Sequence, residues 1–220
     1  MACIKGLVFD MDGLLVDTEG LHVEAWRELF EKRGIKPEET VYGDYAGVAD
    51  NVFLGDLKKG GIVGFPLNTD DLIREKTEKL VRAAERSSIY LFPGVKEVLE
   101  AVSGRFQVAV ASNSERGFVE AVLKNTGLAE NFGCIVSRND VKNPKPEPDI
   151  YLAAAKQMGL TPSECLVFED SEVGVLSAKK AGMLCVAITT TSPEEKLRRA
   201  DYIYGRLEPV SYTHLRAHET

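Results

Sequence analysis

Acidic side chains follow two of the most apolar runs of the sequence, at the point where each run ends. Asp10 and Asp12 come after Ile4–Phe9, and Glu169 and Asp170 come after Cys165–Phe168. The spacing i, i+2 puts the carboxylates of Asp10 and Asp12 on the same side of an extended segment, and Gly13 lets the backbone turn sharply. Acids that converge repel one another and stay ionised only beside a cation. Such hard oxygen ligands are typical of Mg²⁺. For Glu169 and Asp170, helix capping is the alternative explanation.

A hydroxyl and a lysine follow two further apolar runs. Ser112 and Asn113 come after Gln107–Ala111, and Lys145 lies between two prolines soon after Cys134–Ser137. The prolines stiffen the backbone around the lysine, which suits a charge that must be held in one place. The Ser112 hydroxyl and the backbone N–H groups beside it suit a phosphate oxygen. Taken singly, Lys145 could also be a surface lysine and Ser112 a helix cap.

Taken together, these residue types indicate phosphoryl transfer. Carboxylates with Mg²⁺, a lysine and a hydroxyl can neutralise a phosphoryl group during its transfer. Since no activated serine or cysteine is evident, the nucleophile would be an aspartate, and the intermediate an aspartyl-phosphate.

The apolar runs predict the elements that position these residues. None of the runs alternates apolar with polar residues, so each is predicted to be a strand buried on both faces. The runs are Ile4–Phe9, Gln107–Ala111, Cys134–Ser137, Cys165–Phe168 and Leu184–Ile188. Helical segments are predicted between them, beginning near Pro93, Glu115, Pro148 and Ser171. This alternation predicts an α/β protein with a doubly wound parallel sheet, which binds ligands beyond the carboxyl ends of its strands.

A long stretch without a convincing strand interrupts this alternation. Amphipathic helices are predicted at Leu21–Arg33 and Thr69–Arg86. Because residues 18–87 are too many for a crossover loop, they predict a helical subdomain inserted after the first strand. The expected organisation is therefore a core of residues 1–17 and 88–210 around an insertion of residues 18–87.

Composition excludes several classes of function. The 27 basic and 34 acidic residues give a net charge of −7, which argues against binding nucleic acid or an anionic membrane. No apolar run approaches the ~18 residues of a membrane helix, and the first residues do not form a signal peptide. The four cysteines (Cys3, Cys134, Cys165 and Cys185) are widely spaced and are predicted to be reduced thiols. We therefore expect a soluble, cytoplasmic protein.

The segment Asp10-Met11-Asp12-Gly13-Leu14-Leu15-Val16-Asp17 resembles the first motif of the haloacid dehalogenase superfamily. Ser112, Lys145 and Glu169-Asp170 fall where the second, third and fourth motifs of that family would be, so the resemblance extends over residues 3 to about 208. It implies a Rossmann-like core with an α-helical cap, and a requirement for Mg²⁺.

The resemblance also implies a role for each motif residue. Asp10 would accept the phosphoryl group, Asp12 would act as general acid and base, and Ser112 and Lys145 would hold the phosphoryl group. The implied metal ligands are Asp10, the backbone carbonyl of Asp12 and Asp170, with Glu169 nearby. Dehalogenating relatives lack the second aspartate, so Asp12 favours phosphoryl transfer over cleavage of a carbon–halogen bond.

The segment from Glu19 to Trp26 looks like the start of the cap in beta-phosphoglucomutases and related sugar phosphatases. His22 and Trp26 share a helix face, where they could contact substrate or pack the cap against the core. Mutases of this group carry a serine-arginine pair after Gly-Val, where this chain has Ala49-Asp50. An acid there disfavours a bisphosphorylated intermediate. We therefore predict a phosphatase for a small phosphate monoester such as a sugar phosphate, with a phosphosugar mutase as the alternative.

Three further polar residues are candidates for contacts with the substrate, namely Asn113, Lys76 and Asn51. The expected partner is a small phosphorylated metabolite, and a monomer needs no special explanation. A receiver-like, non-catalytic phosphoacceptor also carries an aspartate and a lysine at strand ends, but it lacks a long helical insertion.

The last ten residues, Ser211–Thr220, fit nothing before them. They contain His214 and His218 at a spacing of i, i+4, without an accompanying apolar face. The string resembles translated adapter sequence, so we expect it to be non-native and loosely attached, with the native chain ending near Val210.

Overall fold

A computed structural model describes residues 3–35, 37–38, 41–42, 45, 47–61 and 68–208. Its centre is a six-stranded sheet with the strand order β3-β2-β1-β4-β5-β6, in which all neighbouring strands are parallel. The strands are β1 (Gly6–Phe9), β2 (Gln107–Ala111), β3 (Cys134–Val136), β4 (Cys165–Glu169), β5 (Leu184–Ile188) and β6 (Tyr202–Tyr204). The predicted doubly wound α/β fold is therefore confirmed.

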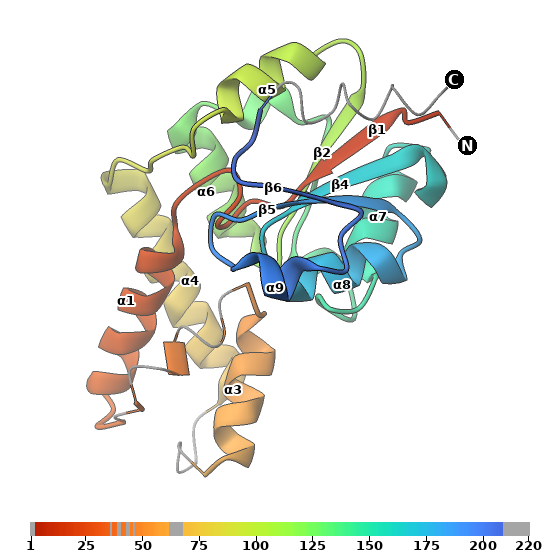
Figure 1. The fold of residues 1–220 in the computed structure, drawn as a ribbon. Coiled ribbons are helices and arrows are strands. Elements are labelled where there is room, and N and C mark those ends of the chain that lie inside the picture. The colour runs from red at the N-terminus through yellow and green to blue at the C-terminus, as the bar shows by residue number, and fades with distance from the viewer. Residues whose placement is uncertain are drawn as a thin grey trace.

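Helices cover both faces of the sheet (Figure 1). Helices α5 (Val95–Val102) and α6 (Arg116–Thr126) pack on one face, and α7 (Asp149–Gln157), α8 (Glu172–Lys180) and the short α9 (Glu194–Leu197) pack on the other. Three 3₁₀ turns complete the core, at Ala129–Asn131, Arg138–Asp140 and Pro162–Glu164. Successive strand residues face opposite sides, so Leu7 and Phe9 join the first cluster while Val8 joins the second. Burial on both faces explains why the strand sequences are continuously apolar.

Among the residues that the structure describes, three helices with defined bounds lie between β1 and α5, namely α1 (Glu19–Glu31), α3 (Asp50–Lys59) and α4 (Thr69–Arg86). We call them the inserted helices. Figure 1 shows them together beyond the end of the sheet to which β1 leads. They share an apolar cluster of their own, which includes Trp26, Phe30 and Phe53. No helix among the described residues is long and apolar enough to cross a membrane.

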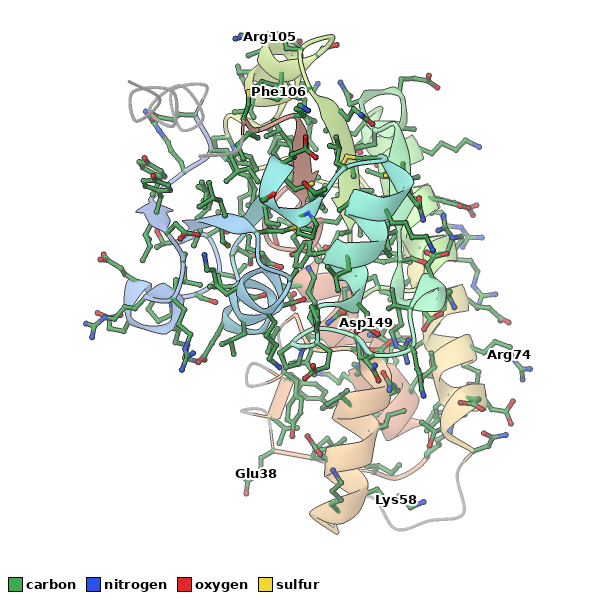
Figure 2. All side chains as sticks on the ribbon, turned by 90° about the vertical axis from the view of Figure 1, so that its right-hand side faces the viewer. Glu38, Lys58, Arg74, Arg105, Phe106 and Asp149 are labelled. Carbon is green, nitrogen blue, oxygen red and sulfur yellow. The ribbon has the colours of Figure 1, made fainter. Side chains whose placement is uncertain are left out.

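Helix α4 connects the inserted helices to the core because its buried face continues past their own cluster. Leu72 belongs to the cluster of the inserted helices, whereas Leu80 and Ala84 belong to the main core cluster with α6. Charged residues occupy the opposite face of α4, as Figure 2 shows for Arg74, whose side chain extends away from the protein. The boundaries expected for the insertion stay a prediction, and the proposed non-native tail lies outside the described residues.

The four cysteines differ in burial, and this predicts a difference in their reactivity. Cys3 is exposed, whereas Cys165 and Cys185 are buried. Burial raises the pKa of Cys165 to about 11 and also raises the pKa of Cys185. Because the thiolate is the reactive form, iodoacetamide at neutral pH should alkylate Cys3 quickly and reach the two buried thiols only in denaturant. Peptide mass mapping with and without urea measures this, and fast labelling of Cys165 in the native protein would contradict it.

Candidate active site

Three central strands end at the same level, which brings their following residues together. In the register of the sheet, Phe9 pairs with Val110 on one side and with Phe168 on the other. Asp10, Ala111-Ser112 and Glu169 therefore lie at the same carboxyl edge of the sheet, as predicted from the strand ends.

A group of three buried carboxylates occupies this edge. Oxygen atoms of Asp10, Glu169 and Asp170 all lie within 4.8 Å of one another. Gly13 makes the arrangement possible because its φ is +83° and a Cβ there would lie 2.3 Å from Asp170 Oδ2. The site therefore needs glycine at position 13, both for the backbone turn and for space.

Lys145 supplies the positive charge in this group. Its Nζ donates hydrogen bonds to a carboxylate oxygen of Asp10, to Glu169 Oε1 at 2.6 Å and to the Ala111 carbonyl at 3.1 Å. Burial alone would lower the pKa of Lys145, but the carboxylates of Asp10 and Glu169 outweigh it and raise that pKa. The lysine is 2% exposed and stays charged, so it is not the surface lysine that the sequence left open.

Both carboxylate oxygens of Glu169 are already bonded to the protein. Oε1 accepts from Lys145 and from the Tyr151 hydroxyl at 2.6 Å, and Oε2 accepts from the backbone N–H of Asp170 and from Ser171. A Cβ at Gly174 would lie 1.7 Å from Glu169 Oε1, so glycine is required there as well. Ser171, rather than an acid, caps helix α8 by accepting from the Gly174 N–H at 3.1 Å.

Asp170 has an unsatisfied oxygen that fits a cation. Its Oδ2 accepts a hydrogen bond from the Thr191 hydroxyl, while its buried Oδ1 has no hydrogen-bond partner. Burial, together with the neighbouring carboxylates, raises the pKa of Asp170 well above its usual value, and the pKa of Asp10 is raised in the same direction. A divalent cation would relieve this repulsion and bond the orphaned oxygen. The donor set therefore fits Mg²⁺.

The carboxylate of Asp12 accepts its hydrogen bonds from hydroxyl groups rather than from a lysine. Its Oδ1 accepts from the Thr18 hydroxyl at 2.6 Å, and its Oδ2 accepts from the hydroxyls of Ser112 at 3.0 Å and Ser114 at 2.9 Å. His22 Nε2 lies 3.6 Å from Oδ1. Burial raises the pKa of the Asp12 carboxyl, but His22 and the hydroxyl groups of Thr18 and Ser114 outweigh burial and lower the pKa to about 2.

The inserted helices supply the opposite wall of a cavity over this edge. Lys76 is 1% exposed and occupies the apolar stripe of α4 between Leu72 and Leu80. Its Nζ donates to His22 Nδ1 at 2.9 Å and to the carboxylate of Asp50, and it lies 4.9 Å from the centre of the Trp26 ring. The cavity is lined by Asp10, Asp12 and Lys145 from the sheet edge and by His22, Trp26 and Lys76 from the inserted helices.

The side chains of two candidate substrate contacts are hydrogen-bonded to other residues of the protein. Asn51 accepts a hydrogen bond from Arg138 at 3.3 Å and lines a neighbouring cleft. Asn113 lines the cavity, but its side-chain amide is bonded to Gly47 and to the backbone of Lys145.

Several residues of the site were not identified from the sequence. They are Thr18, Ser114, Tyr151 and Thr191, each of which donates a hydroxyl hydrogen bond to a site carboxylate. Ser114 had a usable signal because it stands two residues after Ser112. The other three carry no local pattern, since only the tertiary fold brings them to the carboxylates.

The fold and the site together define an α/β protein with a buried lysine among carboxylates at the carboxyl edge of its parallel sheet. Residues 4–182 match the family model of haloacid dehalogenase-like hydrolases, and the chain belongs to this family. The family resemblance seen in the sequence motifs is thereby confirmed.

Two of the relatives are named as phosphatases of phosphorylated carbohydrates. The chain is 37% identical over 186 residues to the fructose-1-phosphate phosphatase YqaB of Escherichia coli, covering 83% of this chain and 95% of the relative. It is 32% identical over 182 residues to a phosphorylated carbohydrates phosphatase of Thermotoga maritima, covering 82% of each chain. The solved structure of a beta-phosphoglucomutase from Clostridium difficile matches with a TM-score of 0.85 at 26% identity, covering 97% of this chain and 96% of that one.

Proposed function

We propose that this enzyme is a Mg²⁺-dependent phosphatase that hydrolyses a sugar phosphate or a similar small monoester through an aspartyl-phosphate on Asp10. The observation that carries the proposal is the position of Asp10 at the wall of the cavity, where it accepts from the ammonium group of Lys145 and lies beside Asp170, whose buried Oδ1 has no hydrogen-bond partner. The activities named for the two phosphatase relatives support the substrate class.

Asp10, Asp170 and the backbone carbonyl of Asp12 would hold the magnesium ion, with Glu169 behind them because its oxygens are occupied. When bound, the ion supplies positive charge to the phosphate oxygens and to the attacking carboxylate. Lys145 adds a second, permanent positive charge from the protein itself.

The proposed reaction has two steps. In the first, a carboxylate oxygen of Asp10 bonds to phosphorus, the bond from phosphorus to the ester oxygen breaks, and Asp12 donates a proton to that leaving oxygen. In the second, Asp12 takes a proton from water while the water oxygen bonds to phosphorus. The bond between phosphorus and Asp10 then breaks, which releases phosphate and restores the carboxylate.

The environment of Asp12 suits both roles. With a pKa of about 2 the free enzyme holds Asp12 as a carboxylate, the form that takes a proton from water. A phosphate dianion entering the cavity raises the pKa of Asp12 by repulsion of like charges, and this favours the protonated form that the first step needs.

The pairing of Lys76 favours a phosphatase over a mutase. Of the described residues that line the cavity two are lysines, and both are ion-paired, Lys145 with Asp10 and Lys76 with Asp50. The second dianion of a sugar bisphosphate would approach the Asp50 carboxylate, which repels it and already neutralises the charge of Lys76. The similarity to a beta-phosphoglucomutase structure keeps a phosphosugar mutase as the second candidate.

Phosphate release from a panel of sugar and nucleotide phosphates tests the proposal. We expect Mg²⁺-dependent release that EDTA stops and added Mg²⁺ restores, with sugar monophosphates among the best substrates. The same panel, primed with a sugar bisphosphate, is examined for isomerised sugar phosphate. Isomerisation without net phosphate release would favour the mutase, and neither activity with any substrate would contradict the enzyme that we propose.

Asp50→Asn should shift the substrate preference. Replacing this carboxylate by an amide leaves the charge of Lys76 uncompensated, so the cavity should accept a second anionic group more readily. We expect kcat/KM for a sugar bisphosphate to rise roughly 10-fold relative to that for the monophosphate, as a change of about 1.4 kcal/mol would give. Asp71→Asn, which changes an exposed ion pair with Arg74 on α4, is the matched control. An unchanged ratio in Asp50→Asn would show that Asp50 does not set this preference.

A further inference from the structure

The side-chain amide of Asn113 joins two loops that both reach the site. Its Nδ2 donates to the Gly47 carbonyl at 3.0 Å and to the Lys145 carbonyl at 3.5 Å, and its Oδ1 accepts from the Lys145 N–H at 3.0 Å. Gly47 precedes α3 in the insertion, whereas Lys145 lies in the loop between β3 and α7. The amide therefore uses its donor on both loops and its acceptor on the lysine loop alone.

Gly47 rests directly on the core. Its φ is +72°, and a Cβ there would lie 3.2 Å from Ser171 Cβ and 3.3 Å from Ser171 Oγ. Ser171 in turn donates its hydroxyl to Glu169 at 2.9 Å. The loop at Gly47 is thus held between Asn113 and Ser171, three residues before Asp50 opens α3 and pairs with Lys76.

Both ends of Lys145 depend on the same segment of chain. Asn113 holds the backbone of Lys145, and the carbonyl of Ala111, two residues earlier, accepts from its Nζ at 3.1 Å. With the backbone and the ammonium group both fixed to the end of β2, the charge is directed at Asp10. Loss of the Asn113 amide would release the backbone end of this arrangement.

We infer that Asn113 is a positioning residue, which couples the seating of the Gly47 loop on the core to the placement of Lys145 at Asp10. The inference rests on the proposed function, in which the charge of Lys145 stabilises the transferring phosphoryl group. It assigns the Asn113 side chain to the alignment of the site rather than to a contact with the substrate.

A double-mutant cycle of Asn113→Ala and Gly47→Ala tests this coupling. Asn113→Ala removes the amide, and Gly47→Ala pushes the loop away from Ser171 by steric contact. We expect each to lower kcat roughly 10- to 100-fold with KM within about twofold of wild type, because a misplaced charge reduces stabilisation of the transition state rather than binding. If the two residues act through one contact, the double variant should be no slower than the slower single variant.

Gly34→Ala is the matched control for strain. Gly34 lies in the same insertion with φ +68°, but a Cβ there meets no atom within 4 Å. We expect its kcat to be close to wild type, and its effect to multiply with that of Asn113→Ala. If Asn113→Ala does not fold, Asn113→Asp takes its place in the double-mutant cycle. This variant keeps the acceptor for the Lys145 N–H and loses the donor to Gly47.

The outcomes separate this inference from the proposed function. A raised KM with unchanged kcat in Asn113→Ala would make Asn113 a substrate contact, and kcat losses that multiply in the double variant would show that the two residues act independently. The midpoint of urea unfolding is measured for the same set of variants. It depends on the contact between Asn113 and Gly47 whether or not the enzyme is active. Inactive wild-type enzyme counts against the proposed function, whereas additive shifts of the unfolding midpoint overturn the coupling itself.

Discussion

Asp10→Asn is expected to abolish phosphate release while the protein remains folded. The amide is nearly the same size as the carboxylate but is a far weaker nucleophile, so no aspartyl-phosphate forms. We expect kcat to fall by at least about 1,000-fold, as is typical when the attacking group itself is removed. Steady-state phosphate release with the best sugar phosphate of the panel measures the change.

The stability of the same variant separates lost chemistry from lost structure. In the metal-free enzyme, Asp10 lies among carboxylates at a buried site, and burial together with Glu169 raises its pKa against the opposing effect of Lys145. Removing one acid from this group relieves repulsion while Lys145 keeps its ion pair with Glu169, so thermal unfolding in EDTA should occur at no lower temperature than for wild type. Asp71→Asn, outside the cavity, should leave both activity and unfolding unchanged. Activity above a tenth of wild type in Asp10→Asn would place the nucleophile elsewhere.

Most of the core could be predicted from the sequence because its strands are buried on both faces. Such strands form continuous apolar runs, and five of the six were found in this way. The missed strand β6 is the edge sequence Tyr-Ile-Tyr, whose three residues are only partly buried. Helix α3 was also missed, and the packing of its Phe53 against Trp26 and Phe30 of α1 is a tertiary contact that the sequence does not display.

The location of the site was predictable, but the direction of its side chains was not. The rule that parallel strands end together placed Asp10, Ser112 and Glu169 at one edge. The two-residue spacing of Asp10 and Asp12 suggested a shared direction. In the structure one carboxylate meets Lys145 and the other meets three hydroxyl groups. The turn at Gly13 and the surrounding donors decide this, and both depend on tertiary contacts.

For Lys76, the unusual position was visible in the sequence, but the partners of its charge were not. A lysine between Leu72 and Leu80 interrupts the apolar stripe of α4, and this interruption of the helical period is visible in the order of residues alone. Its partners His22 and Asp50 come from α1 and from the start of α3, so only the packed helices show that the charge is paired at the cavity.

Lys145→Met is expected to have the largest effect on stability. The substitution keeps an apolar chain of similar length but leaves Glu169, which is fully buried, and Asp10 without their cation. Removing one partner of a buried ion pair costs roughly 3–5 kcal/mol in the free energy of unfolding. Activity should fall at least about 100-fold as well, because the charge on the transferring phosphoryl group loses its fixed partner. Urea unfolding measures the loss of stability at about pH 7.5, which lies well above the typical pKa values of carboxylic acids.

The control and the pH dependence identify charge as the cause. Lys180→Met breaks an ion pair with Glu147 that is about half exposed, and such pairs contribute little to stability. In wild type Lys145 lowers the pKa of Glu169 against the effect of burial, so this acid contributes stability above its unfolded-state pKa and loses it as the pH falls through the lowered folded-state value. In Lys145→Met, Glu169 has no cation beside it. A falling pH therefore protonates Glu169 and removes the cost of its buried, unpaired charge. The stability difference between the two proteins should therefore narrow as the pH falls from about 7.5 towards 4.5. A difference that stays constant over this range would instead attribute the loss to packing around the lysine side chain.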